Sequence, residues 1–210
     1  MKKIGIAGLV LGGLAAWTSI GLADKGRDLA PAKPARVALA ETFDGQQLGS
    51  HWKVNKGQWQ PEAGALVGRE QKEDQHAAVV TLARPFTNAA IRFSFQCDGA
   101  TGFNLSFNHA KGHLFRILIA EDSLAILKDR DKKDAASRPA TLARQKVSLP
   151  SGQWHTLLVE VHGDRVVVHT EQGVEVAAAD PALAVEKTGY RFVTRAGPLR
   201  IDDVTVWQGE

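Results

Sequence analysis

Titratable side chains recur at alternate positions of the segments that are predicted to be β-strands. In the run 154–162, Glu160 and His162 share one face, since successive side chains in a strand point to opposite sides. A carboxylate beside an imidazole can exchange protons with a bound molecule, and Arg116 could join them in an acid–base group. Glu160 and His162 are therefore the candidate catalytic residues, although an ordinary surface ion pair accounts for the same pattern.

Amides, hydroxyls and arginines form a larger set on what is predicted to be the same sheet surface. The runs 90–97 and 102–108 alternate between apolar and polar residues, which predicts strands with one buried and one open face. Side chains that supply both donors and acceptors suit a hydroxyl-rich ligand such as a sugar, but a water-facing sheet has the same composition. The candidate ligand-binding residues are Arg92, Ser94, Gln96, Asn104, Ser106, Asn108, Arg116 and His169.

Histidine and aspartate spacings do not indicate a metal centre. His109 and His113 are four residues apart, but that spacing converges on a metal only in a helix, and none is predicted here. Asp129, Asp131 and Asp134 resemble part of a calcium loop, yet the glycine and closing glutamate of an EF-hand do not follow. No cofactor is required by these residues.

Motifs for nucleophilic catalysis are missing from the sequence. It has no Gly-x-Ser-x-Gly elbow and no phosphate-binding loop. The single cysteine, Cys97, is placed on the apolar face and is expected to be a buried small hydrophobe. Trp52, Trp59, Trp154 and Trp207 lie at strand starts and ends, where they either complete the core or stack on sugar rings.

The elements that carry these residues are predicted to be short strands separated by Gly, Asp, Asn and Pro. Such spacing favours an all-β sandwich or closed barrel. Hairpin turns are expected at Gly163-Asp164 and Gln172-Gly173, a loop at 128–138 and a strand at 146–149. Pro181 interrupts the Ala-rich stretch 177–185, which predicts a single helical turn at most.

The first 23 residues have the pattern of a signal peptide. A basic start is followed by an apolar stretch and by small residues at Gly21 and Ala23, suited to cleavage; an uncleaved membrane anchor is the alternative. Residues 24–36 contain Pro31 and Pro34 and are predicted to be a linker, and residues 37–210 the domain. We therefore expect an exported bacterial protein, periplasmic or extracellular.

Charge argues against a nucleic-acid partner. Without the two lysines of the leader, 24 basic residues face 23 acidic ones, mixed in sign along the chain. Hydrophobic residues make up 44% of the sequence, which is enough for a sizeable core without disulfides. We expect a monomer with no membrane contact once the leader is removed.

Several short motifs, taken in order, resemble the concanavalin A-like/laminin-G-like jelly-roll superfamily over residues 38–208. They are Glu41-Thr42-Phe43-Asp44-Gly45, Gly57-Gln58-Trp59, Gly152-Gln153-Trp154-His155-Thr156-Leu157 and Ile201-Asp202-Asp203-Val204-Thr205-Val206. Within it, the chain most resembles the bacterial 3-keto-disaccharide hydrolase-like domains. The resemblance implies an antiparallel two-sheet jelly-roll sandwich that binds ligands on its concave sheet. It also implies a possible structural calcium near Asp44 and Asp202 or Asp203.

Three functions are consistent with the polar face and the resemblance. The first is carbohydrate binding on the concave sheet without chemistry. The second is a glycoside hydrolase of the 3-keto-disaccharide type, which usually needs two carboxylates facing one bond. Glu160 is the only acidic residue placed mid-strand on the polar face, and the Glu-x-Asp-x-x-Glu signature of jelly-roll glucanases is missing. The third is an extracellular protein–protein adhesion module, for which a large exposed apolar patch is expected. Carbohydrate binding is the first expectation.

Overall fold

Alternating apolar and polar residues build strands throughout the described chain, which comprises residues 29–33 and 35–209 of the computed structural model. One sheet contains β1 (Arg36–Glu41), β3 (Gln58–Pro61), β4 (Leu66–Arg69), β6 (Ala89–Cys97), β11 (His155–His162), β12 (Arg165–Thr170), β13 (Glu175–Ala179) and β15 (Leu199–Gln208). The other contains β2 (Trp52–Lys56), β5 (Ala78–Leu82), β7 (Gly102–His109), β8 (Gly112–Ala120), β9 (Ser123–Lys128), β10 (Ala140–Lys146) and β14 (Tyr190–Thr194).

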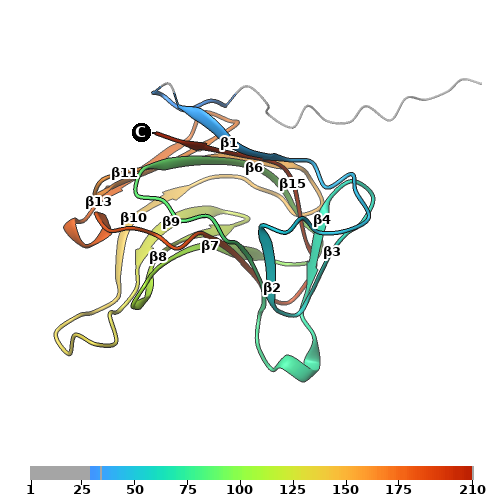
Figure 1. Ribbon diagram of the computed structural model, residues 1–210, viewed down its shortest axis with the longest axis horizontal. Helices are drawn as coiled ribbons and strands as arrows, with labels where there is room; N and C mark the ends of the chain where they lie inside the picture. The colour runs from blue at the N-terminus through green and yellow to red at the C-terminus, as the bar shows by residue number, and fades with distance from the viewer. Residues whose placement is uncertain (1–28, 34, 210) are drawn as a thin grey trace, which may run out of the picture.

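The two sheets bend in the same sense and form an arch (Figure 1). The outer layer, here called the convex sheet, has the strand order β13-β12-β11-β6-β15-β4-β3, with β1 beside β15. The inner layer, the concave sheet, has the order β10-β9-β8-β7-β14-β5-β2, and its pairs are antiparallel throughout. The predicted fold, an all-β jelly-roll sandwich of two antiparallel sheets, is confirmed.

Aromatic side chains from both layers hold the sheets together. Phe93 and Phe95 of β6 point inward. The ring centroid of Phe93 lies 5.2 Å from that of Phe192, and the ring centroid of Phe95 lies 4.9 Å from that of Phe103, both in the concave sheet. All four are almost fully buried, and burying one such ring stabilises a fold by roughly 1.5–3 kcal/mol. The sandwich is therefore closed by its apolar faces, which leaves the two outer faces pointing in opposite directions.

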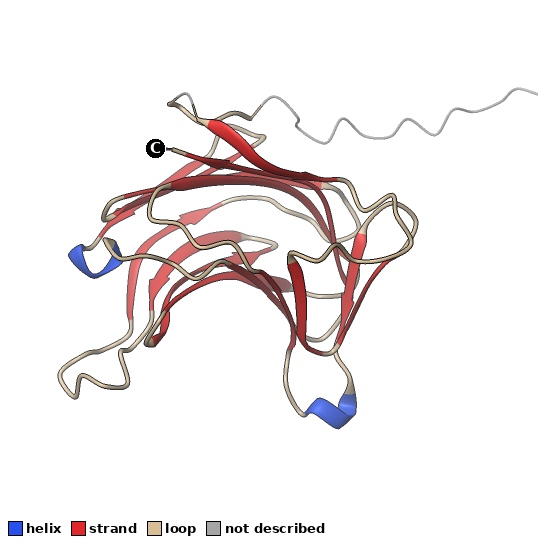
Figure 2. Cartoon of the chain, viewed as in Figure 1, coloured by secondary structure: helices blue, strands red, loops and turns tan. Residues whose placement is uncertain are grey.

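Local predictions were correct where turn chemistry fixed them. The Gly163-Asp164 hairpin joins β11 to β12, and the turn at Gln172-Gly173 joins β12 to β13. The only helices in the described residues are two 3₁₀ turns, η1 (Lys72–Asp74) and η2 (Pro181–Leu183), drawn in blue in Figure 2. Neither is long and apolar enough to cross a membrane.

Two boundaries differ from the sequence-based expectation. The strand expected at 146–149 begins earlier, because β10 pairs with β9 from Ala140 onward and ends at Lys146. The predicted linker ends inside a strand, since β1 begins at Arg36 and pairs with β15. The predicted leader lies outside the described residues.

Candidate functional site

The predicted polar face is divided between the two sheets. Arg92, Ser94 and Gln96 lie on β6, Glu160 and His162 on β11 and His169 on β12, all in the convex sheet. Asn104, Ser106 and Asn108 lie on β7 and Arg116 on β8, in the concave sheet. The expectation of one continuous surface was wrong, because β6 and β7 follow each other in sequence but pair with different strands. Arg116 consequently cannot join Glu160 and His162 in an acid–base group.

Glu160 on the convex sheet already has partners within the protein. The backbone N–H of Ala32 donates to Glu160 Oε1 at 2.9 Å, and His169 Nε2 lies 2.9 Å from Glu160 Oε2. Its imidazole partner is therefore His169, whereas His162 is exposed and lines a hollow of about 410 Å³ beside residues 31–33. Both oxygens of the predicted catalytic carboxylate are therefore engaged, one with the chain ahead of β1 and the other with His169 of β12.

The other predicted residues of the convex sheet also have structural contacts. The Arg92 guanidinium donates to the Leu29 carbonyl at 3.1 Å and lies 5.4 Å from the centroid of the Trp207 ring. Ser94 is only 1% exposed, and the Gln96 amide donates to a backbone carbonyl at 2.6 Å. This face of the molecule is built from residues that stabilise the fold.

The concave sheet presents a row of polar side chains, one from each of five neighbouring strands. Lys53, Thr81, Arg191, Ser106 and Arg116 are paired in this order from β2 through β5, β14 and β7 to β8. We call these residues the arginine row. Because neighbouring strands are about 4.8 Å apart, the Cα atoms of Arg191 and Arg116 are separated by roughly 10 Å across β7.

Beside the arginine row lies an apolar floor with one amide at its centre. Val193, Asn104 and Leu118 are in register on β14, β7 and β8 and line a hollow of about 470 Å³ whose edge includes Thr101 and Arg195. Asn104 Oδ1 is buried there and accepts no hydrogen bond within the described part of the chain. A buried acceptor without a partner costs roughly 1–3 kcal/mol. The hollow therefore favours a ligand that brings a hydrogen-bond donor to this oxygen.

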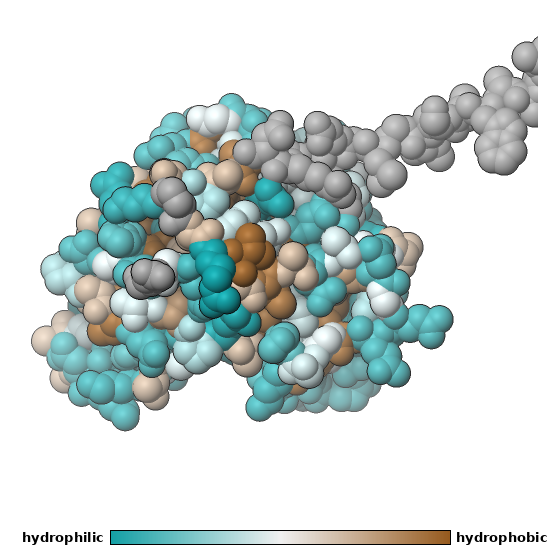
Figure 3. All heavy atoms as spheres, turned by 45° about the horizontal axis from the view of Figure 1, so that its top comes forward, coloured by the Kyte–Doolittle hydropathy of each residue, from teal (hydrophilic) through white to brown (hydrophobic). Residues whose placement is uncertain are grey.

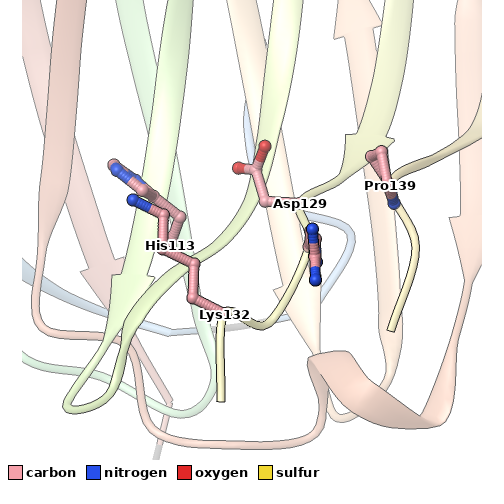
Figure 4. A pocket seen from close by; sticks show the side chains of 5 residues that line it. His113, Asp129, Lys132 and Pro139 are labelled. Atoms are coloured by element: carbon pink, nitrogen blue, oxygen red, sulfur yellow. The ribbon is translucent and has the colours of Figure 1, made fainter. Parts of the chain in front are cut away.

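A second pocket lies at the end of the concave sheet, against the loop that follows β9. It has a volume of about 480 Å³ and is lined by His113, Asp129, Arg130, Lys132 and Pro139 (Figure 4). Asp129 forms an ion pair with Arg116, which connects the pocket to the arginine row. His113 Nδ1 lies 3.1 Å from Asn108 Oδ1. Because that amide oxygen only accepts, Nδ1 carries the proton and Nε2 of the neutral ring is left as an acceptor.

The electrostatic field of this region is positive. Burial lowers the pKa of His113, and the neighbouring positive charge of Arg191 lowers it further, with smaller contributions from Lys132 and Arg116. Asp129 acts in the opposite direction but does not outweigh them. Burial also lowers the pKa of Arg191 itself. His113 is therefore neutral at pH 7, and cations outnumber anions around it.

Three residues of this region were missed as ligand contacts by the sequence-based interpretation. His113, which lies in β8, was considered only as a metal ligand, and Asp129 was considered only for calcium. Arg191 was not considered, although a signal was present: it separates the apolar Tyr190 and Phe192 in a predicted strand. A charged residue at an outward position between two core aromatics indicates an open sheet face.

Cys97 and the aspartates suggested as calcium ligands have structural contacts or are buried. Cys97 is buried, and burial raises its pKa to about 11, so that it remains an inert thiol at neutral pH. Asp202 Oδ1 accepts from the Asp203 N–H at 2.7 Å, and Asp44 accepts from the Thr42 hydroxyl. In the described residues no group of three or more His, Cys, Asp or Glu side chains is arranged to hold a metal ion. The calcium implied by the resemblance stays a prediction.

Two of the tryptophans, Trp52 and Trp59, are core residues. Trp52 is 7% exposed and Trp59 is 5% exposed, and both belong to the hydrophobic core between the sheets. The Trp59 ring packs against Gly68, where an added Cβ would lie 2.4 Å from it. The strands of the concave sheet place no Phe, Tyr or Trp on the outer face in the described chain, because their aromatic side chains are buried.

The fold is shared with solved carbohydrate-related structures. The chain is similar to the carbohydrate-binding module CBM66 from Bacillus subtilis, with 14% identity and a TM-score of 0.62 over 78% of this chain and 97% of that one. It is also similar to SCLam, a non-specific endo-β-1,3(4)-glucanase from family GH16, with 12% identity and a TM-score of 0.65 over 87% and 94% of the chains. The laminarinase from Rhodothermus marinus is 9% identical, with a TM-score of 0.60 over 83% and 98%. At these identities the likeness defines the class of fold, a concanavalin A-like jelly-roll sandwich.

The particular family is defined by sequence. Residues 39–203 match the model of the 3-keto-alpha-glucoside-1,2-lyase-like domain, and the chain belongs to that family. The family description names a lyase, whereas the resemblance of the motifs was to domains named for hydrolysis. No curated protein sequence gives a significant match to the chain.

Proposed function

We propose that this domain binds a carbohydrate on the concave sheet, over the Asn104 hollow and the arginine row. The observation that carries the proposal is Asn104 Oδ1, a buried acceptor without a partner at the centre of an apolar floor. Val193 and Leu118 suit the C–H face of a sugar ring, and Asn104 suits one of its hydroxyl groups. The family membership and the carbohydrate-related names of the structural neighbours support this choice of ligand.

An adhesion surface has less support. Large exposed hydrophobic side chains in the described chain are limited to Val37, Val54 and Val185, which lie on β1, on β2 and after η2. Figure 3 turns the convex side forward, and the visible surface there is mainly hydrophilic, with small hydrophobic areas. Scattered single residues of this kind are normal for a soluble surface.

Two matched substitutions test which sheet binds the sugar. Val193 on the concave sheet and Val167 on the convex sheet are both half-buried, outward-facing and lining a hollow. We expect Val193→Trp to fill the concave hollow and weaken glycan binding at least tenfold, because a bulky ring excludes the ligand. Val167→Trp should leave binding unchanged.

The measurement is a glycan array followed by calorimetric titration of the best ligand, with thermal melting of both variants. If the two variants bind equally well, or if only Val167→Trp loses affinity, the concave sheet is not the binding face. If the unsubstituted protein binds no glycan, the proposed function is wrong.

A second candidate function is 1,2-elimination on a 3-keto-α-glucoside, and the geometry of His113 favours it. Asn108 holds the Nδ1 proton and leaves Nε2 as a base at neutral pH. In such a reaction the base removes the C2 proton, which the C3 ketone acidifies. The electron pair forms the C1–C2 double bond, the C1–O bond breaks, and the departing oxygen takes a proton. Developing negative charge on the ketone oxygen would be stabilised by Arg191, and no carboxylate pair is needed.

His113→Gln tests this reaction, with His162→Gln as the matched control on the convex sheet. We expect His113→Gln to lower the rate of release from a 3-keto-α-glucoside by about 10²–10⁴-fold, the usual contribution of a general base. His162→Gln should retain the full rate. Equal loss in both variants, or no turnover by the unsubstituted protein, would remove elimination as a function and leave carbohydrate binding to be judged by its own experiment.

A further inference from the structure

Charge is distributed unequally between the strands of the two sheets. The convex strands carry five acidic residues and five arginines, which are Glu41, Glu160, Glu175, Asp202 and Asp203 with Arg36, Arg69, Arg92, Arg165 and Arg200. The concave strands carry no Asp or Glu, but they contain Lys53, Lys56, Arg116, Lys128, Arg144, Lys146 and Arg191. Lys56, Lys128 and Arg116 form ion pairs with Asp74, Asp180 and Asp129 outside these strands. The cations that remain are not balanced by acidic residues of the same strands, and a surface of one sign attracts ligands of the other sign.

Arg191 at the centre of the arginine row lacks a counter-charge. Its guanidinium makes no hydrogen bond or ion pair with any described residue, although the side chain is only partly exposed. Removing a cation from water without a partner is unfavourable, and a bound oxyanion would reverse that cost. Across β7, Arg116 is neutralised by Asp129, so the available charge is concentrated on Arg191 and on Lys53 further along the row.

The loop pocket extends the positive region. Arg130 and Lys132 line it together with His113, and Asp129, its acidic residue, is already paired with Arg116. Arg191, Lys132 and Arg116 each contribute to lowering the pKa of His113, after burial, and Asp129 opposes them, so these charged groups lie around one imidazole. Cations are therefore present on β14 and in the loop after β9, with the paired Arg116 and Asp129 between them in the strand order.

The concave face also lacks the feature that would recognise a neutral sugar by stacking. Its outward positions hold no Phe, Tyr or Trp in the described chain, since Phe103, Phe107 and Phe192 point into the core. Aromatic platforms contribute to binding through their large, flat apolar surface. Without one, selective affinity on this face must come from hydrogen bonds and charge.

We infer that the saccharide bound on the concave sheet is anionic, with a carboxylate or sulfate group held by Arg191 and the cations beside it. This inference rests on the proposed function and adds the substrate class to it. A guanidinium donates two parallel hydrogen bonds to the oxygens of either group, which makes arginine suited to both. A uronate and a sulfate ester are the two sources of this chemistry, and the experiment separates them.

The test compares ligands that differ only in charge. Oligogalacturonate and its methyl ester have the same sugar backbone, and a sulfated galactan and its desulfated form make the second pair. We expect one of the anionic forms to bind at least tenfold more tightly than its neutral partner, and the preference to shrink as salt rises above about 0.15 M. Arg191→Gln should reduce binding of the anionic form roughly 10- to 100-fold. Arg165→Gln, an exposed arginine of the convex sheet, is the matched control and should leave it unchanged.

Each result decides between the two proposals. Equal affinity for charged and neutral forms overturns the anionic inference and leaves carbohydrate binding intact. Loss of the preference in Arg165→Gln rather than Arg191→Gln also overturns it. If polyglutamate binds as tightly as the anionic saccharide, the preference is non-specific charge attraction. The inference that the ligand is a saccharide would then be wrong. Failure of every saccharide, neutral or anionic, to bind would contradict the proposed function itself.

Discussion

The two sheets of this sandwich use charged residues in opposite ways. On the convex sheet, Glu160 contacts His169 and the Ala32 N–H, and Arg69 forms a two-bond ion pair with Glu62. On the concave sheet, Arg191 has no partner among the described residues. Paired charges add to the stability of the fold, whereas an unpaired, partly buried charge costs stability and is available to a ligand. The charged side chains of the convex sheet are therefore engaged within the protein, which is consistent with the ligand-binding role proposed for the concave sheet.

The largest stability effect is expected where buried His155, at the start of β11, loses its ion pair with the partly exposed Glu171. His155 is 5% exposed, its Nδ1 lies 3.0 Å from Glu171 Oε1, and its Nε2 lies 3.1 Å from the Pro150 carbonyl. Both partners are acceptors, so the ring is held as imidazolium. Glu171→Gln should lower the free energy of unfolding by about 2–3 kcal/mol, because the buried cation loses its counter-charge.

Urea denaturation measures this loss, with Glu175→Gln as the control. The Glu175 carboxylate is 54% exposed and lies 3.7 Å from His169 Nδ1, so its loss should change stability by less than about 0.5 kcal/mol. Similar effects of the two variants would show that burial does not set the strength of these pairs.

The next largest effect should be an increase in the free energy of unfolding. Lys187, which precedes β14, is fully buried, and the contacts described for its ammonium are the Thr87 carbonyl at 3.3 Å and the Phe86 ring centroid at 5.7 Å. Burial lowers its pKa from 10.5 to about 8. Lys187→Met should raise the free energy of unfolding by about 1–2 kcal/mol at pH 7, where the buried charge is unfavourable.

The gain in stability expected for Lys187→Met should depend on pH. A lysine whose pKa is lowered in the folded state destabilises it fully below about 8, and the cost disappears as pH approaches 10.5. Denaturation curves of both proteins at pH 7 and pH 10 should therefore differ less at the higher pH. A gain that does not shrink would point to packing rather than charge.

A smaller change in stability should distinguish an ion-paired arginine, Arg69, from Arg191, which has no counter-charge among the described residues. Arg69 donates to both oxygens of Glu62, at 2.6 and 2.8 Å, and this pairing lowers the pKa of Glu62 to about 2. Arg69→Gln should destabilise the fold by up to about 1 kcal/mol without affecting glycan binding. Arg191→Gln should change stability by less than about 0.5 kcal/mol while weakening binding. If the two variants exchange these phenotypes, the division of roles between the sheets is wrong.

The smallest effect concerns the pH dependence of the convex sheet. Burial lowers the pKa of His155, but the hydrogen bonds to Glu171 and Pro150 outweigh it and raise the pKa overall. A raised histidine pKa stabilises the folded state fully below the unfolded value near 6.5 and no longer does so above the folded value. Stability should decline as pH rises from about 6 to 8, and His155→Gln should flatten this dependence in urea titrations. An unchanged slope would contradict the imidazolium assignment.

Alternation along single strands predicted burial well. Phe103, Leu105 and Phe107 were placed inward and are buried, while Asn104 faces outward between them. This pattern is local, because strand geometry alone decides which side chains share a face. The same reasoning placed Cys97 in the core.

Membership of a sheet could not be predicted in this way. Whether Arg92 and Asn104 share a surface depends on β6 pairing with β11 and β15, and on β7 pairing with β8 and β14. These partners are mostly distant in sequence, and nothing within residues 90–108 specifies them. The arginine row could not be predicted from sequence for the same reason. Its side chains come from five separated segments, and only the pairing register of the strands brings them together.

Residues 31–33 and the last described residue, Gly209, border the same hollow of the convex sheet. The described chain therefore enters and leaves the sandwich on the side opposite the arginine row (Figure 1). A fusion partner, affinity tag or surface linkage joined through either of these segments would point the concave sheet away from its attachment. Immobilised protein should then keep the concave sheet open to polymers too large to diffuse beneath it.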